Sequence, residues 1–223
     1  MQQRYYDPAV GRFLSVDPET ASSANGGNFN RYWYGNNNPY KFVDPDGRYS
    51  CVAAKKSDCA SVANYAKAVR AAAKDPPRGT SVAQKQELRA IAGYIGTEGD
   101  GSGPAITVGA LAGQKLASSD QKGNWTIDVK KANGSDHSLA RGAMALGHEA
   151  KHDIDAKSRG IATTESAVRT RETAAYNIQA VIGRSTGFSM TQENINAAID
   201  GSVATWKERE DARMNGPTSG GDP

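Results

Sequence analysis

Apolar residues recur at helical spacing through most of the chain after residue 57. They fall three and four positions apart, so one face of each helix would carry them to a core. Pro76-Pro77 ends the first helical segment, and Gly160 ends the third. A turn precedes the third segment, where Asp136 or Ser138 can accept the first free amides. The predicted helices span residues 60–73, 82–95, 139–157, 163–183 and 191–213.

Two short segments are typical of strands, residues 106–111 and residues 125–129. The second belongs to a longer alternating stretch, Asn124 to Lys130, in which polar and apolar side chains would face opposite ways. A few strands among five helices indicate an α+β fold that is mainly helical and has a small sheet.

The first 48 residues differ from the helical part. They are rich in Tyr, Asn and Gly, and Asp-Pro or Asn-Pro pairs repeat in turns at 7–8, 17–18, 38–39 and 44–45. Short strands fit at 12–16 and 31–34, but the segment is too short and too polar to hold a core alone. We therefore predict four parts: this segment, a junction (49–58), a helical domain (59–213) and a flexible tail (214–223).

Composition and charge narrow the classes of function. The chain has 223 residues, 38% of them hydrophobic, and is expected to be soluble. Its net charge of +3 is too small to indicate nucleic acid by itself. It contains no run of eighteen apolar residues, so no membrane span is expected, and its N-terminus lacks the apolar core of a signal peptide. The two cysteines, Cys51 and Cys59, are equally consistent with a disulfide and with free thiols.

The stretch Gly147-His148-Glu149-Ala150-Lys151-His152-Asp153 contains the pattern His-Glu-x-x-His. On a helix, residues four apart share a face, so His148 and His152 would direct two imidazoles at one point, as a zinc ion requires. Glu149 lies beside that point and could take a proton from a zinc-bound water. The alternative is a surface helix with two solvated histidines. Because the chain has only three histidines, a chance match is rare.

A catalytic zinc needs a third protein ligand, and three carboxylates follow in sequence. Asp155 lies three residues after His152 and is otherwise a solvated helix end. Glu165 falls in the first turn of the next predicted helix, where an acidic side chain already suits the helix dipole. Glu172 falls within the apolar stripe of that helix, where a carboxylate should be paired or metal-bound. We choose Glu172, with Glu165 and Asp155 as rivals.

His148-Glu149-x-x-His152 with a glutamate on the next helix resembles the zincin metallopeptidases, in particular the gluzincin branch. The resemblance covers about residues 125–182. It implies a Zn²⁺ held by His148, His152 and Glu172, with Glu149 as the catalytic residue. It also implies a strand along the cleft that pairs with substrate backbone, for which the alternating stretch 124–130 is the candidate.

A second resemblance covers residues 3–47. The run Arg4-Tyr5-Tyr6-Asp7-Pro8-x-x-Gly11-Arg12-Phe13-Leu14-Ser15-x-Asp17-Pro18, and a later run that closes on Asp44-Pro45-Asp46-Gly47, are similar to the RHS-repeat-associated core of polymorphic toxins. In that family a variable toxin domain follows the closure, and self-cleavage releases it. By position, Asp17 and Asp44 match the aspartates of that reaction, and the cut would follow Arg48. As residues alone, these aspartates are also ordinary turn formers.

The two resemblances imply a secreted effector toxin, delivered by a bacterial secretion system into rival cells, that hydrolyses peptide bonds of a target-cell protein. The implied partners are this protein substrate, a cognate immunity protein and the RHS shell, and no nucleic acid is expected. Two alternatives stay open: a non-catalytic effector that only binds a protein, and a toxin of another hydrolase class, such as a nuclease.

Overall fold

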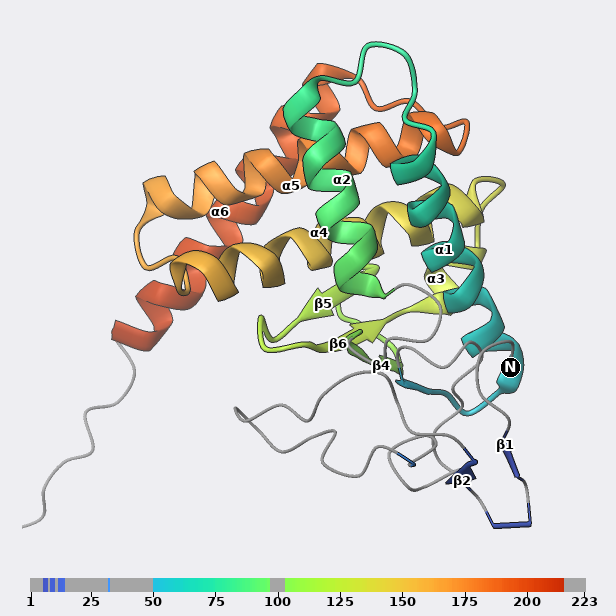
Figure 1. Ribbon diagram of the computed structural model, residues 1–223. Helices are drawn as coiled ribbons and strands as arrows, with labels where there is room; N and C mark the ends of the chain where they lie inside the picture. Colours follow the sequence, from blue (N-terminus) through green and yellow to red (C-terminus); the bar gives the residue numbers. More distant parts are fainter. Residues whose placement is uncertain are drawn as a thin grey trace, which may run out of the picture.

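The computed structural model describes residues 6–7, 9–10, 12–14, 32, 50–96 and 103–214. A folded body extends from Ser50 to Met214 and is mainly helical with a small sheet, which is the predicted α+β class (Figure 1). The helices are α1 (Lys56–Lys74), α2 (Val82–Ile95), α3 (Val129–Asn133), α4 (Ser138–Arg159), α5 (Glu165–Ser185) and α6 (Gln192–Met214). The strands are β1 (Tyr6–Asp7), β2 (Arg12–Phe13), β3 (Ser50–Val52), β4 (Ala105–Val108), β5 (Ala117–Ser119) and β6 (Asn124–Ile127).

The body contains a mixed four-stranded sheet in the order β3-β4-β6-β5. β3, β4 and β6 are parallel, and β5 is antiparallel to β6 with Ser118 opposite Thr126. The expectation that the stretch 124–130 lies along a cleft is therefore wrong. β6 lies inside the sheet between β4 and β5, and the chain enters α3 at Val129 because the Asp128 side chain accepts from Lys131 N–H and caps that helix. The two edge strands are β3 and β5, and β5 is the one that contacts α4.

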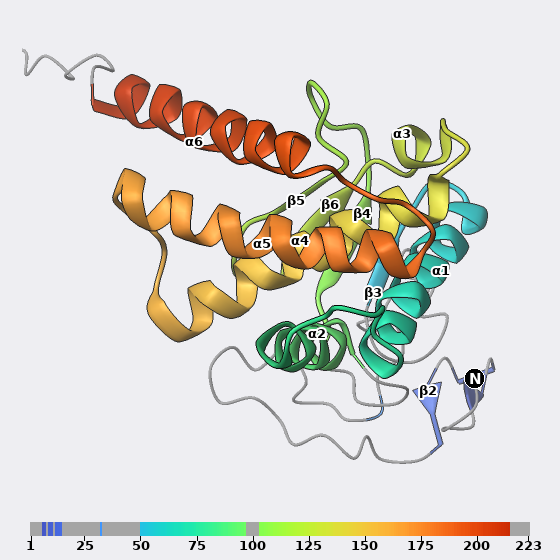
Figure 2. The same cartoon turned by 90° about the horizontal axis from the view of Figure 1, so that it is seen from above.

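The helices gather on one side of this sheet (Figure 1). α4 packs against α1 and α2 on one flank and against α5 on the other, and α6 packs on the outer side of α5, as Figure 2 shows from above. One core joins the sheet to α1, α2, α4 and α5, and a smaller apolar cluster joins α5 to α6. The largest fully buried side chains of the main core are Trp125, Leu88, Ile91, Ile95, Ile106, Ile127, Leu146, Ile178 and Ile182.

The predicted helices form close to their expected bounds, and side-chain caps fix the starts of two of them. Ser81 and Gln84 make a reciprocal capping box at the start of α2, and Thr164 caps α5. The start of α4 is different. Its N-cap is His137, which makes no side-chain cap hydrogen bond, instead of the expected Asp136 or Ser138. The His137 ring packs against Phe188 with the centroids 5.2 Å apart, which holds this turn by contact with the segment after α5.

Residues 50–58, which fall in the predicted junction, contribute to the folded body. β3 pairs with β4, and α1 begins at Lys56. Cys51 and Cys59 form a disulfide that fastens β3 to the first turn of α1, and both residues are buried. The two open interpretations of the cysteines are thus resolved in favour of the cross-link, while the division of the chain into domains stays a prediction.

We expect Gly142→Ala to lower the free energy of unfolding by about 2 kcal/mol. Gly142 lies on α4 under the buried Tyr65 ring of α1, and a Cβ would stand 2.5 Å from three ring atoms. Urea denaturation measures the effect. Gly201→Ala is the matched control, because this glycine of α6 has open space around it, so alanine should stabilise by about 0.5–1 kcal/mol. Equal effects at the two positions would contradict the close α1–α4 contact.

Candidate metal centre

α4 presents the two histidines of the His-Glu-x-x-His motif on one face, as their spacing predicts. Their Nε2 atoms lie 3.0 Å apart, and the rings meet at 72° with the centroids 4.7 Å apart. Each side chain is 12% exposed. His148 and His152 therefore direct nitrogens at one nearly buried point.

Close packing of α5 on α4 brings a third group to this point. Gly147 precedes His148, and a Cβ at this glycine would collide with Cδ1 of Ile182 on α5. The absence of a side chain lets α5 approach, and its Glu172 reaches the histidines. The carboxylate oxygens lie 3.5 Å from His148 Nε2 and 3.3 Å from His152 Nε2. The predicted third residue thus joins the pair.

The charges of the three groups are coupled. Burial acts to raise the pKa of Glu172, but its interactions with His148 and His152 outweigh burial and hold that pKa well below its usual value. For His152, burial acts to lower the pKa, yet the hydrogen bond and the charge of Glu172 raise it overall. Glu172 is therefore an anion at neutral pH, which is the form in which a carboxylate binds a metal ion.

The donor set fits a zinc ion. His148, His152 and Glu172 each offer one ligand atom, and these atoms lie within 4.8 Å of one another. Two imidazole nitrogens and one carboxylate oxygen are a common protein set for catalytic zinc. Glu172 Oε2 is buried and has no hydrogen-bond partner within the described part of the chain, so a bound cation would satisfy it.

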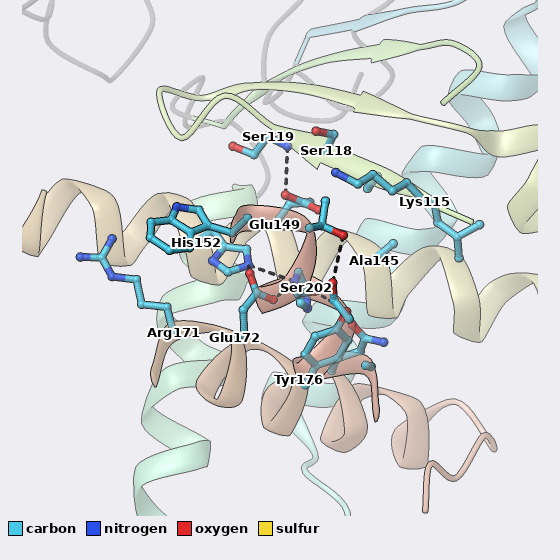
Figure 3. Close-up of a pocket in the computed structure, with 18 of the residues that line it drawn as sticks. Lys115, Ser118, Ser119, Ala145, Glu149, His152, Arg171, Glu172, Tyr176 and Ser202 are labelled. Carbon is cyan, nitrogen blue, oxygen red and sulfur yellow. Dashed lines mark hydrogen bonds and ion pairs between the residues drawn. The ribbon is translucent and has the colours of Figure 1, made fainter. Parts of the chain in front are cut away.

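Glu149 stands outside this group, as the motif predicts. Its Oε2 accepts a hydrogen bond of 2.9 Å from the backbone N–H of Ser119 on the edge strand β5. Figure 3 shows Glu149, His152 and Glu172 turned toward the same space from α4 and α5, with Ser119 above Glu149. One oxygen of Glu149 is thereby fixed, and the other remains for a proton.

Sequence reasoning missed Asp153, which lies on the core side of α4 directly after His152. It is fully buried and accepts hydrogen bonds from Tyr94 of α2, Ser119 of β5 and Trp125 of β6. Burial, together with the hydrogen bond that the Tyr94 hydroxyl donates to Asp153, raises the pKa of Tyr94. Ser119 contacts Asp153 through its hydroxyl and Glu149 through its N–H, so Asp153 helps to position the edge strand that holds Glu149. The available signal was Trp125, because a buried indole N–H needs an acceptor.

Tyr176 was also missed, although it lies one turn after Glu172 on α5. Its ring meets the His148 ring edge-on with the centroids 4.5 Å apart, and its hydroxyl lies 3.1 Å from that of Ser202 on α6. Burial, followed by the charges of Glu172 and Glu149, raises the pKa of Tyr176 despite the Ser202 contact. Tyr176 thus orients His148 and joins α6 to the site.

The two rival ligands are engaged elsewhere. Asp155, for which a solvated helix end was the alternative to a ligand role, is buried, and Lys151 one turn earlier pairs with it at 2.7 Å. Glu165 is exposed and pairs with Lys207 of α6 at 3.2 Å. Asp17 and Asp44, the aspartates matched to self-cleavage, lie outside the described residues, as does Arg48.

A cleft of about 840 Å³ opens over the three ligand candidates. β5 and the loop before it line one side, α4 lines the floor, and α5 and α6 line the other side. Four cationic side chains reach the cleft, Lys115, Arg141, Arg171 and Arg209, whereas its carboxylates are Glu149 and Glu172. No helix in the described ranges is long and apolar enough to cross a bilayer.

Comparison with known proteins finds relatives for a short stretch. The chain is 49% identical over 49 residues to the tRNA(Glu)-specific nuclease WapA of Bacillus subtilis subsp. natto, the tRNA nuclease WapA of Bacillus subtilis strain 168 and the tRNA3(Ser)-specific nuclease WapA of Bacillus spizizenii. In each case the match covers 22% of this chain and 2% of the relative. No family model and no solved structure matches the chain. The shared stretch is too short to include most of the body from Ser50 to Met214.

Proposed function

We propose that the body from Ser50 to Met214 is a zinc-dependent peptidase that forms the toxic part of a larger secreted protein. One observation carries the proposal. Two histidines and a glutamate from two helices converge in a cleft, and a second glutamate beside them is held by an edge strand. Zincin peptidases need three residues that bind the metal and a separate carboxylate that accepts and donates a proton.

His148, His152 and Glu172 would hold the ion, which when bound would supply a Lewis acid and a more acidic water. Glu149 would accept the proton of the attacking water and return it to the leaving amine. Because Ser119 N–H holds Oε2 of Glu149, the other oxygen is the proton acceptor. β5 would bind the substrate backbone as an added strand, since it is the edge of the sheet and lines the cleft.

The toxin context rests on the relatives and on the resemblance of residues 3–47 to the RHS core. Three relatives named for different or unspecified tRNAs match this chain with the same identity over the same length. A stretch common to proteins of differing specificity does not encode that specificity. This favours a shared carrier segment followed by a variable effector. Delivery into rival cells, the shell and an immunity protein belong to the same proposal.

A nuclease is the second candidate, and the names of the relatives favour it over the peptidase. The cations of the cleft suit phosphate groups as well. The geometry favours the peptidase, because His148, His152 and Glu172 converge on one point and Glu149 lies beside them. A purely protein-binding effector would use the cleft without catalysis.

We expect the purified protein to carry about one zinc ion per chain and to hydrolyse a randomised peptide library, with both properties lost on chelation. Metal analysis and mass spectrometry of the products measure them. The same preparation is incubated with total tRNA. Chelator-sensitive cleavage of tRNA without cleavage of peptides would reject the peptidase in favour of the nuclease. A fully stable protein that binds no zinc would reject the proposed metal centre.

A further inference from the structure

The cleft keeps its cations unpaired. None of its four cations forms an ion pair within the described residues: Lys115 of the loop before β5, Arg141 of α4, Arg171 of α5 and Arg209 of α6. Two cations of α5 and α6 that do not line the cleft are paired instead, Arg169 with Asp200 and Lys207 with Glu165. The four cations of the cleft are thus available to an anionic ligand beside the candidate metal centre.

The four cations form two pairs, one at each end of the cleft. Arg141 lies seven residues before His148, two turns toward the start of α4, and Lys115 precedes β5 near that end. Arg171 adjoins Glu172, and Arg209 lies toward the end of α6, which runs antiparallel to α5 and brings Lys207 to Glu165. Figure 3 shows Lys115 and Arg171 on opposite sides of the Glu149, His152 and Glu172 group.

The burial of two of these residues strengthens their effect. Arg141 and Arg171 are partly buried, and the carboxylates among the described residues that line the cleft are Glu149 and the candidate ligand Glu172. An arginine beside low-dielectric walls attracts an anion more strongly than a fully solvated one. Guanidinium groups also bind carboxylates in a bidentate manner.

We propose that the cleft selects peptide segments that carry aspartate or glutamate on both sides of the scissile bond, an inference that rests on the peptidase activity proposed above. Lys115 and Arg141 bind the acidic side chains on one side of the bond, and Arg171 and Arg209 bind those on the other. An extended peptide along β5 would place its ends at these two pairs.

The arrangement of charge favours a peptide over RNA. Nucleic acid carries a phosphate at every nucleotide and is bound by a continuous cationic surface. In this cleft the two cationic ends are separated by Glu149 and the three candidate metal ligands, and among the described lining residues no lysine or arginine lies between them. A peptide whose acidic side chains are separated along its length can place them at the two cationic ends. Its backbone can pair with the edge strand β5 between them.

The test uses two internally quenched peptides with one sequence, taken from the cleavage site found in the randomised library. One carries glutamate on both sides of the bond and the other carries glutamine at the same positions. We expect kcat/KM to be about 25-fold higher for the glutamate peptide, from about 5-fold at each end. Raising the salt concentration to about 0.5 M should reduce this ratio because screening weakens the pairs.

Variants assign the preference to the cleft. Arg141→Gln and Arg171→Gln should each lower kcat/KM for the glutamate peptide about 5-fold and leave the glutamine peptide unchanged. Arg89→Gln, on the exposed face of α2 and outside the cleft, is the matched control and should change neither rate. Zinc content and melting temperature confirm that each variant is loaded and folded.

The outcomes separate this inference from the peptidase itself. Equal rates on both peptides, or a preference that survives both arginine variants, would overturn the acidic selectivity and leave the peptidase standing. If no peptide of the library is cleaved, the affinities of the zinc-loaded protein for one extended peptide with glutamates spaced along it and for its glutamine counterpart are compared by fluorescence anisotropy, and equal Kd values overturn the selectivity. If the protein cleaves tRNA and the rate of this cleavage falls in Arg141→Gln and Arg171→Gln, the cations bind RNA, and the acidic selectivity is overturned as well.

Discussion

Glu149→Gln should reduce peptide hydrolysis by about 10²–10⁴-fold while the protein keeps its zinc and its fold. Glutamine has nearly the shape of glutamate and can still accept the 2.9 Å hydrogen bond from Ser119 N–H through its amide oxygen. What it lacks is a carboxylate that takes a proton from water. Rates on the library-derived peptide, together with zinc content and melting temperature, measure the effect.

The same variant separates catalysis from binding in cells. Induced without an immunity protein, Glu149→Gln should not arrest growth if toxicity comes from hydrolysis. A protein-binding effector would remain toxic, because the surface of the cleft is nearly unchanged. Undiminished killing by a folded, zinc-loaded Glu149→Gln protein would reject the peptidase mechanism.

Glu172→Gln should weaken zinc binding by at least about 100-fold, because loss of an outer partner of a metal site already costs 10–100-fold. The substitution removes the anionic oxygen between His148 and His152, 3.3–3.5 Å from their Nε2 atoms. Competition with a chromogenic chelator measures the affinity. Activity should fall in parallel, since only loaded protein turns over.

Two controls accompany this prediction. Glu165→Gln removes an exposed carboxylate that pairs with Lys207, and Asp155→Asn removes one that pairs with Lys151. Both should retain zinc, although Asp155→Asn should lose some stability because Lys151 is buried. Zinc loss in either control, with retention in Glu172→Gln, would show that we chose the wrong third ligand.

The part of the site that could be predicted from sequence depends on helical periodicity. The four-residue spacing of His148 and His152, and the position of Glu172 in an apolar stripe, are properties of single helices, and helix geometry is nearly invariant. The caps at Ser81 and Thr164 are equally local. The structure brings the three residues together as expected, whereas zinc binding itself stays a prediction.

The part that could not be predicted depends on contacts between segments. β5 has three residues and no strong alternation, and only its pairing with β6 makes it a strand. The role of Asp153 needs Tyr94, Ser119 and Trp125 to meet, and these residues come from three different elements. The start of α4 at His137 likewise depends on Phe188, more than fifty residues later. The pattern of residues within one segment carries no information on contacts between residues of different segments.

The disulfide between Cys51 and Cys59 makes the attachment of β3 sensitive to the redox state of its surroundings. A cross-link closing a loop this short stabilises a fold by roughly 2–3 kcal/mol, and thiol-reducing compartments such as the cytosol remove it. After reduction, β3 would be held by its three-residue pairing with β4 and by the burial of Cys51. A protein that passes from an oxidising space into a reducing one would therefore loosen first at the point where the body joins residues 1–49, and the candidate metal ligands on α4 and α5 would be affected last.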